Sequence, residues 1–218
     1  MLFLDSADDA ECAHWVATAL VRGVTTNSTL LMKAGVKRAT AAADRILGFG
    51  APEVHVQVMA EEPERAFEQA GELAAFDPRI VVKIPFVTAS GRLRTDVVGR
   101  CVETGIPVNV TACTTLAQGL AALAVGPRYV SLLWCRTRDT GEDPRRVVTS
   151  LVSRRDRLGN GTRALVGSVR EPRDLTDALE AGADVVTVPP HVLGPWLSSD
   201  ASLAMARQFR DDALGLEL

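Results

Sequence analysis

The sequence predicts an α/β fold, a single (β/α)8 TIM barrel with parallel strands. Eight short runs rich in Val, Ile and Leu recur along the 218 residues, and Ala- and charge-rich amphipathic segments separate them. Strands that alternate with helices form parallel βαβ units, and eight such units suffice to close a barrel. An open doubly wound sheet is the alternative, but no Gly-x-Gly-x-x-Gly motif follows the first run to support a dinucleotide site.

The individual elements follow from apolar periodicity and from the residues that favour helix ends. The expected strands are Leu2–Asp5, Gly23–Thr25, Val54–Met59, Ile80–Pro85, Pro107–Cys113, Tyr129–Trp134, Ala164–Val169 and Val185–Pro189. The expected helices include Ala7–Arg22, Pro63–Phe76, Leu93–Thr104, Thr115–Ala124, Asp143–Leu158 and Pro172–Ala181. Several of these begin at Pro or at a capping Ser, Thr or Asp and end near Gly, as helix termini commonly do.

The end of the chain is expected to be a further helix. Asp200–Leu214 places Leu203, Ala206, Phe209 and Ala213 at helical spacing, so an amphipathic helix with an apolar face is predicted. No low-complexity segment or linker interrupts the sequence before it, and one domain is therefore expected over residues 1–218.

Composition excludes several classes of protein. The net charge is −3 with no basic stripe, which argues against binding to nucleic acid. No apolar run approaches the roughly 20 residues that span a bilayer, so no membrane association is expected. The cysteines are scattered and form no Cys-x-x-Cys motif; they are Cys12, Cys101, Cys113 and Cys135. With no signal peptide, these features indicate a reduced, cytoplasmic protein without a structural metal site.

One lysine stands out from the rest of the sequence. Lys83 is one of only three lysines, and it lies within the apolar run Ile80–Pro85, whereas Lys33 and Lys37 lie in a polar stretch expected to be an exposed helix. Burying an ammonium group without a partner is costly, so desolvation lowers the pKa of such a lysine and favours the neutral amine. A neutral amine can attack a carbonyl and form a Schiff base. The alternative is a strand-end lysine whose ammonium group reaches water.

Polar side chains end most of the predicted strands. In a (β/α)8 barrel the active site lies at the carboxyl ends of the strands. Those ends here carry Asp5, Thr25-Thr26-Asn27, Gln57, Lys83, Asn109 with Thr111, Arg136 and Ser168. Their common position predicts a single polar site at one end of the barrel.

The motifs around these residues resemble those of a known family. Leu2–Ser6 followed by Gly23–Thr29 is similar to the opening of the transaldolase family, and Val81–Pro85 is similar to its Schiff-base strand. Asn109–Thr111 resembles the family's fifth-strand motif, and Ala181–Pro189 its eighth strand. The resemblance runs nearly end to end and includes the small bacterial transaldolases and the fructose-6-phosphate aldolases. It implies a class I enzyme on a (β/α)8 barrel.

The resemblance implies a catalytic role for four residues. Lys83 would be the Schiff-base nucleophile, and Asp5 would accept and return the proton of the substrate hydroxyl. Gln57 would orient the catalytic water, and Thr111 would position that water or substrate hydroxyls. Asp5 has an alternative as the N-cap of the helix that follows it, a position that Asp favours.

Six further residues would bind substrate. Thr26 would position water or hydroxyls, Asn27 would hold a substrate hydroxyl and the carbinolamine, and Arg136 with Ser168 would hold the sugar phosphate. The remaining substrate-binding candidates are Asn109 and Leu133. Asn27 has an alternative as a turn residue, and Arg138 competes with Arg136 as the phosphate ligand.

The chain departs from the family at several positions. Gln57 matches the glutamine of the aldolases, whereas transaldolases usually carry glutamate. Leu133 replaces the aldolase tyrosine or the transaldolase phenylalanine, and its missing hydroxyl should disfavour hydrolytic release of a three-carbon product. Cys113 and Cys135 either line the mouth of the barrel, by strand periodicity, or are small buried hydrophobic residues. His55 points into the barrel or is a satisfied core histidine, and the latter is favoured.

The resemblance implies a transaldolase that moves a dihydroxyacetone unit from a ketose phosphate to an aldose phosphate. Such an enzyme needs no cofactor. It also implies a homo-oligomer, pentamer or decamer, in which the C-terminal helix contacts a neighbouring subunit. The alternatives are a fructose-6-phosphate aldolase, favoured by Gln57; a transaldolase specialised for an unusual long-chain sugar such as the lincosamide octose; and a non-catalytic sugar-phosphate binder. Leu133 and Asn109 favour the transferase.

Overall fold

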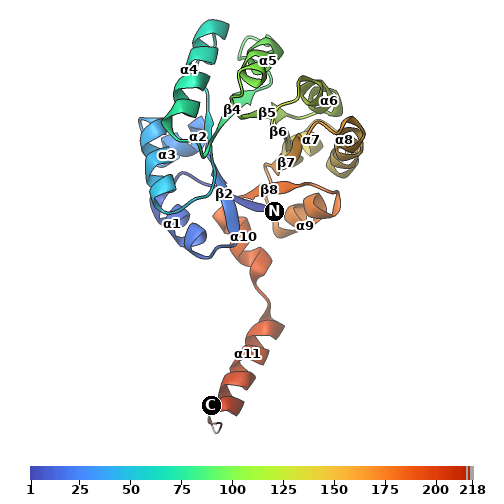
Figure 1. Ribbon diagram of the computed structural model, residues 1–218. Helices are drawn as coiled ribbons and strands as arrows, with labels where there is room; N and C mark the ends of the chain where they lie inside the picture. The colour runs from blue at the N-terminus through green and yellow to red at the C-terminus, as the bar shows by residue number, and fades with distance from the viewer. Residues whose placement is uncertain (215, 217–218) are drawn as a thin grey trace.

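A computed structural model describes residues 1–214 and 216, and its centre is a closed barrel of eight parallel strands (Figure 1). Each strand pairs with the next strand in the sequence, and β8 closes the barrel against β1. The strands are β1 (Leu2–Asp5), β2 (Val21–Thr25), β3 (Val54–Gln57), β4 (Ile80–Pro85), β5 (Val108–Cys113), β6 (Tyr129–Leu133), β7 (Arg163–Gly167) and β8 (Val185–Val188). The (β/α)8 prediction is confirmed.

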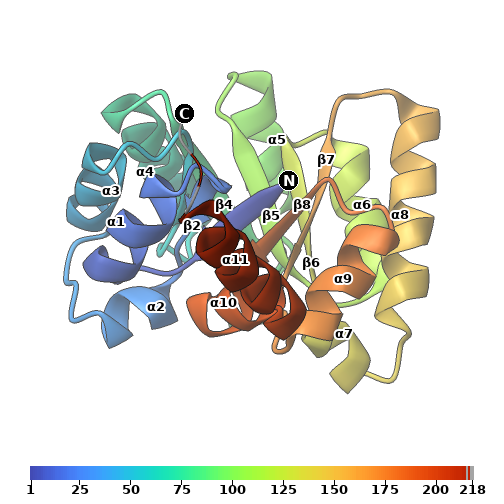
Figure 2. The same ribbon diagram turned by 90° about the horizontal axis from the view of Figure 1, so that it is seen from below.

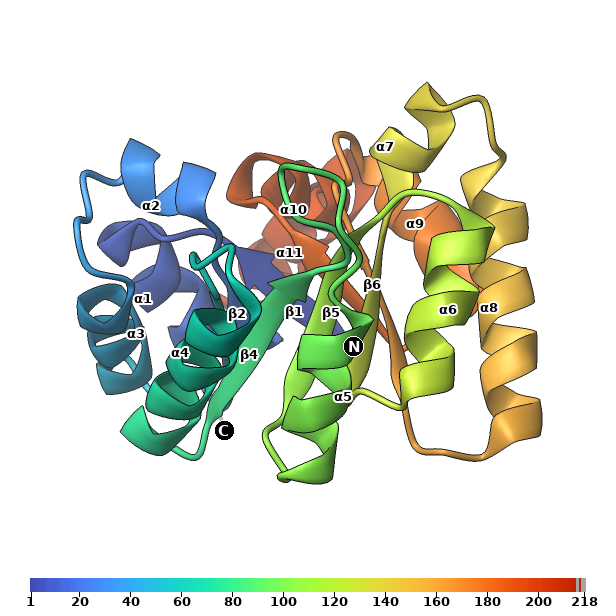
Figure 3. The ribbon, with the colours of Figure 1, turned by 90° about the horizontal axis from the view of Figure 1, so that it is seen from above.

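Every helix except the last lies around the outside of the strands in Figure 1, and Figure 3, turned by 90°, shows helices on both sides of the barrel. The helices of the described residues are α1 (Asp9–Ala17), α2 (Ser28–Lys33), α3 (Ala39–Gly48), α4 (Pro63–Phe76), α5 (Thr95–Glu103), α6 (Leu116–Val125), α7 (Trp134–Asp139), α8 (Pro144–Leu158), α9 (Pro172–Glu180), α10 (Pro190–Leu197) and α11 (Asp200–Ala213). No helix in this described part of the chain is long and apolar enough to cross a membrane.

The core has two layers because each strand is covered on both faces. A large apolar cluster fills the space between strands and helices, and a smaller cluster made of Phe3, Val81, Tyr129, Leu165 and Val185 packs separately from it. Side chains alternate between the two faces of a strand, so the residue two positions after each member of the small cluster lies on the same face as that member. All five of these residues line the cavity described below: Asp5, Lys83, Ser131, Gly167 and Thr187. The small cluster is therefore the packed layer inside the barrel that underlies the site.

The first helix is shorter than the sequence predicted, and the second strand is longer. The helix expected at Ala7–Arg22 ends at Ala17, and Ala19 has a left-handed φ of 58° that a continuing helix cannot accommodate. Val21 then pairs with Leu2 and is buried, so β2 begins two residues before the predicted Gly23. The pairing of β2 with β1 therefore determines where the helix ends and where the strand begins.

Of the two alternatives for Cys113 and Cys135, the position at the barrel mouth is wrong and burial is confirmed. Leu133 ends β6, because Trp134 already begins α7, so strand periodicity does not apply to Cys135. In β5, Ala112 has a left-handed φ of 60° and the register shifts between Val110 and Cys113. A β-bulge of this kind interrupts the alternation of side chains. Both thiols are fully buried outside the cavity.

The remaining differences are small. Lys33 and Lys37 do not share one helix as expected, because Lys33 ends α2 and Lys37 lies in the connection before α3, after Gly35 with φ 68°. The strands β3, β7 and β8 end one or two residues earlier than predicted, whereas the length of β4 agrees with the prediction.

The last helix leaves the barrel. Figure 1 shows α11 extending away from the strands and from the other helices, and Figure 2 gives the view from below. The amphipathic helix predicted at the chain end is confirmed, but it buries no residue within the chain: Leu203 is 50% exposed and Phe209 is 62% exposed.

Candidate active site

A cavity of about 410 Å³ opens at the carboxyl ends of the barrel strands. Nine of the ten predicted site residues line it: Asp5, Asn27, Gln57, Lys83, Asn109, Thr111, Leu133, Arg136 and Ser168. Thr26 is the exception. Parallel strands bring these residues together although they are far apart in the sequence, because every strand ends at the same rim.

Lys83 lies on β4 between Gln57 of β3 and Asn109 of β5, which are its partners in the strand register. It is only 7% exposed, and its Nζ donates a hydrogen bond to the Thr26 carbonyl at 2.8 Å. Burial lowers the pKa of Lys83, and the negative charge of Asp5 partly opposes this shift. A larger fraction of this amine is therefore neutral near pH 7 than for a lysine in water, as a nucleophile requires.

Asp5 ends β1 and shares the cavity with Lys83. Its Oδ1 accepts a hydrogen bond from the Thr25 hydroxyl at 2.6 Å, and Thr25 is 2.6 Å from the Thr187 hydroxyl. Burial raises the pKa of Asp5, while the charge of Lys83 and the bond from Thr25 act in the opposite direction. The alternative role as helix N-cap is wrong, because Asp8 caps α1 by accepting from Glu11 N.

Five hydroxyl residues that line the cavity had no predicted role: Ser28 and Thr29 in α2, and Thr25, Ser131 and Thr187 on strands. Thr25, Ser131 and Thr187 line it, and each bonds to a neighbouring polar group of the barrel. For Ser131 and Thr187 the available signal was the alternation of side chains, which places them on the same face as Tyr129 and Val185 two positions before.

Asn27 and Thr26 are placed differently from each other. Asn27 caps α2, where its Oδ1 accepts from Leu30 N at 3.0 Å, and the same side chain lines the cavity. Thr26 is buried; its hydroxyl donates to the His55 carbonyl at 2.9 Å, and only its own carbonyl contacts Lys83. This geometry favours Asn27 as a substrate ligand and gives Thr26 a main-chain contact with the lysine.

Asn109 is held from below by a buried polar network. Its Nδ2 lies 2.9 Å from His55 Nδ1, and its Oδ1 accepts from the Ser131 hydroxyl at 2.7 Å. His55 Nε2 is 2.8 Å from a Glu53 carboxylate oxygen. Because Asn109 donates to Nδ1, the His55 proton sits on Nε2 and points to Glu53. The favoured interpretation of His55 as a satisfied core histidine agrees with this geometry.

Arg136 and Ser168 form the opposite side of the cavity. Arg136 lies in the first turn of α7 and is exposed, and within residues 1–214 and 216 no carboxylate lies within ion-pair distance of it. Arg138 instead pairs with Asp174 at 3.1 Å and does not line the cavity. Of the two arginines, Arg136 is therefore the one available to an anion in the site. Ser168 has a left-handed φ of 58°.

No three His, Cys, Asp or Glu side chains among the described residues are grouped as metal ligands would be. The polar groups of the cavity are instead an amine, a carboxyl, three carboxamides, several hydroxyls and a guanidinium group. This set suits a polyhydroxylated substrate that carries a carbonyl and an anionic group.

Comparison with known proteins identifies similar chains. Residues 2–213 match the family described as transaldolase/fructose-6-phosphate aldolase. A protein of Dehalococcoides mccartyi named "Probable transaldolase" is 33% identical over 194 residues, covering 88% of both chains. One of the same name from Caulobacter sp. is 36% identical over 189 residues, covering 87% of this chain and 85% of the relative.

A solved structure shares the fold at lower sequence similarity. A crystal structure from Burkholderia cenocepacia, provisionally described as a phosphonomutase, has a TM-score of 0.60 and 18% identity, and covers 96% of this chain and 93% of its own. At this identity the similarity concerns the barrel alone.

Proposed function

The chain belongs to the transaldolase/fructose-6-phosphate aldolase family, and from that premise we propose that it is a class I transaldolase. It transfers a dihydroxyacetone unit from a ketose phosphate to an aldose phosphate through a Schiff base on Lys83. The observation that carries this proposal is the buried Lys83 amine, with its lowered pKa, in one cavity with the Asp5 carboxyl.

The first half of the reaction uses Lys83 and Asp5. The Lys83 amine attacks the ketose carbonyl, and loss of water leaves an iminium ion. Asp5 takes the proton of the hydroxyl on the carbon beyond the scissile bond, and the carbon–carbon bond breaks to release an aldehyde. The bonding electrons move into the iminium, which becomes an enamine on Lys83. The iminium is itself the electron sink, so the proposed mechanism needs no cofactor.

The second half reverses these steps with a new aldehyde. The enamine carbon attacks the carbonyl of an aldose phosphate, Asp5 returns the proton to the new hydroxyl, and water releases the product from Lys83. Gln57 is the register partner of Lys83 on β3, and Thr111 lies on β5 two residues beyond its other partner, Asn109. Both line the cavity and suit the placement of that water. An amide cannot take a proton from water, so the proton passes to Asp5.

Substrate selectivity is assigned to the remaining cavity residues. Asn27 and Asn109 offer amide groups to substrate hydroxyls, and Arg136 with Ser168 suits a phosphate because a guanidinium group forms paired, charge-assisted bonds to it. The second candidate, an aldolase that releases free dihydroxyacetone, is favoured by Gln57. Leu133 favours transfer, because it brings no hydroxyl to the water in the cavity.

Borohydride trapping tests the Schiff base directly. Reduction in the presence of fructose 6-phosphate converts the imine to a stable secondary amine, and the chain offers only Lys33, Lys37, Lys83 and its N-terminal amine. We expect the adduct on Lys83 alone, and no adduct on Lys83→Arg. Lys33→Arg is the matched control and should label like the parent protein. Peptide mapping of the adduct to another amine would disprove this mechanism.

Assembly is proposed from the exposed face of α11. Leu203, Met205 and Phe209 are each at least half exposed within the isolated chain. Burial of such side chains is favourable, so we propose a homo-oligomer, pentamer or decamer, in which α11 packs on a neighbouring subunit. Light scattering should show an oligomer for the full chain and smaller species for a chain that ends at Leu197. A monomer at micromolar concentration would contradict this proposal.

A further inference from the structure

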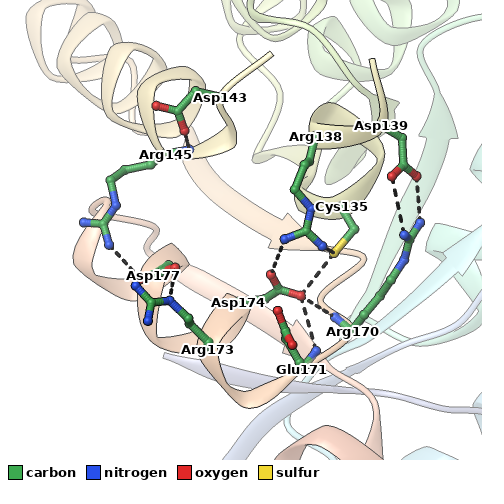
Figure 4. A network of polar contacts seen from close by, with 10 residues as sticks. All are labelled: Cys135, Arg138, Asp139, Asp143, Arg145, Arg170, Glu171, Arg173, Asp174 and Asp177. Carbon is green, nitrogen blue, oxygen red and sulfur yellow. Dashed lines mark hydrogen bonds and ion pairs between the residues drawn. The ribbon is translucent and has the colours of Figure 1, made fainter. Parts of the chain in front are cut away.

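Asp174 is a buried carboxylate that lies outside the cavity. It belongs to the first turn of α9 and is 2% exposed. Figure 4 shows it between α7 and the start of α9, surrounded by hydrogen-bond donors. Its Oδ2 accepts from the main-chain N of Arg170 at 2.9 Å, the main-chain N of Glu171 at 3.3 Å and the Cys135 thiol at 3.1 Å. Its Oδ1 accepts from Arg138 at 3.1 Å.

These contacts require a charged acceptor. Burial alone raises the pKa of Asp174, but the bonds from Arg170 N, Cys135, Arg138 and Glu171 N outweigh it, and the pKa lies below its ordinary value. Burial and the Asp174 charge raise the pKa of Cys135 to about 11, so the thiol keeps its proton and donates. An asparagine at position 174 would present an NH2 group to some of these donors and could not accept from all of them.

The groups that Asp174 holds are the sequence neighbours of two cavity residues. Cys135 and Arg138 lie on either side of Arg136 in α7, and Arg170 follows Ser168 by two residues. The same two segments also meet directly, since Cys135 N donates to the Ser168 carbonyl at 3.2 Å and Arg170 pairs with Asp139 at 2.8 Å. The Arg170–Asp139 pair is exposed, so the buried contacts of Asp174 are the stronger connection.

We propose that Asp174 is a positioning residue for anion binding, which sets the separation of Arg136 and Ser168 by joining α7 to the segment before α9. The anion is a phosphate group, and this part of the inference rests on the proposed function. The backbone of Ser168 supports this proposal as well. Its left-handed φ is costly for a residue other than glycine and persists only where the surroundings hold it.

The experiment compares Asp174→Asn with a matched control on the same helix. Asp177→Asn removes an equal charge one turn later, where the carboxylate bonds to Arg145 and lies outside the cavity. The probe is inorganic phosphate, with its dissociation constant measured by calorimetry on the full chain. Loss of one charge-assisted hydrogen bond corresponds to a change of about tenfold in a dissociation constant. We expect phosphate to bind about tenfold more weakly to Asp174→Asn than to the parent protein, and unchanged to Asp177→Asn.

A second pair of variants separates positioning from a loss of stability. Cys135→Ser keeps a hydrogen-bond donor toward Asp174, whereas Cys135→Ala removes it. We expect phosphate affinity to stay near the parent value in Cys135→Ser and to fall in Cys135→Ala. In kinetic assays Asp174→Asn should raise KM for fructose 6-phosphate and leave kcat/KM for unphosphorylated fructose unchanged.

The outcomes distinguish this inference from the proposed mechanism. Failure of borohydride labelling at Lys83 would reject the Schiff base while leaving the phosphate measurements intact. Equal phosphate affinity in Asp174→Asn and the parent protein would reject the positioning role, as would a parent protein that binds no phosphate. A fall in melting temperature with no change in phosphate affinity or in KM for fructose 6-phosphate would identify a purely structural residue and also reject the positioning role.

Discussion

The two sides of the cavity are built in different ways. Asp5, Thr25, Gln57 and Lys83 lie on strands, and the pairing register of the barrel places Asp5 beside Thr25 and Gln57 beside Lys83. Arg136 and Ser168 lie beyond the strand ends, and hydrogen bonds between α7 and the segment before α9 place them. The strand side carries the groups suited to bond making and breaking, and the rim side carries the groups suited to substrate selection. Substitutions on the two sides should therefore affect different kinetic constants.

The largest effect is expected on the strand side, from Lys83→Arg. Arginine keeps a positive charge near Asp5 but cannot form an imine, so turnover should be lost below detection while the circular dichroism spectrum is retained. Lys37→Arg, an exposed change outside the cavity, should leave kcat unchanged. If Lys83→Arg still transferred a dihydroxyacetone unit, the strand side would not carry the bond-making group, and the proposed difference in function between the two sides of the cavity would be wrong.

Asp5→Asn should give the next largest effect, and it should act on kcat more than on KM. Loss of the proton acceptor should reduce kcat by about a thousandfold, within the usual range for general acid–base groups. Thr25→Val, which removes the hydroxyl that donates to Asp5, should cost less, because the carboxyl itself remains. Equal losses in these two variants would argue that the hydroxyl, rather than the carboxyl, carries the proton.

Asp5→Asn should also change the dependence of stability on pH. Burial raises the folded-state pKa of Asp5 above the ordinary value of about 3.9 for an aspartate. At a pH between the unfolded-state and the folded-state pKa, the folded state therefore holds a proton that the unfolded state has released. The parent protein therefore loses stability as pH rises through this window, and Asp5→Asn avoids that loss. Thermal unfolding should show a higher melting temperature for Asp5→Asn at neutral pH, with a gain that shrinks as pH falls toward the unfolded-state pKa. A gain of equal size at every pH would contradict this explanation.

On the rim side, Arg136→Gln should raise KM for fructose 6-phosphate about tenfold, the value of one charge-assisted contact, with little change in kcat. The matched control is Arg146→Gln, an exposed arginine of α8 outside the cavity. Steady-state kinetics with phosphorylated and unphosphorylated donors measure both constants. A fall in kcat with constant KM would place Arg136 with the strand-side groups.

The smallest effect is expected from Leu133→Tyr, at the junction of β6 and α7. The added phenol could orient a water in the cavity, so the ratio of free dihydroxyacetone to transfer product should rise a few-fold. Leu133→Phe adds the ring without the hydroxyl and is the control. If the parent protein already releases dihydroxyacetone as fast as it transfers it, the assignment moves to the aldolase.

Most of the strand side was predictable from sequence because its signal is local. Lys83 within Ile80–Pro85 and the polar ends of the other strands were visible without a structure, and barrel topology then implied that they meet. Thr25 was among the polar strand ends but had no predicted role, and Thr187 was missed, because threonine is also an ordinary strand residue. The positions of Cys113 and Cys135 were ambiguous for another reason. Strand periodicity was extended beyond the bulge at Ala112 and into α7, where it no longer holds.

The sequence alone determined the barrel, the identity of the nucleophile candidate and seven polar residues that line the cavity, since strand-end polarity depends only on neighbouring residues. These seven are Asp5, Asn27, Gln57, Lys83, Asn109, Thr111 and Ser168, whereas Leu133 came from the family resemblance. Tertiary structure decided which arginine faces the cavity. Arg136 and Arg138 are two residues apart in one short helix, and only the position of Asp174, 36 residues beyond Arg138, engages one and leaves the other available. A contact across that distance depends on how α7 packs against α9, and no local pattern in the sequence encodes it.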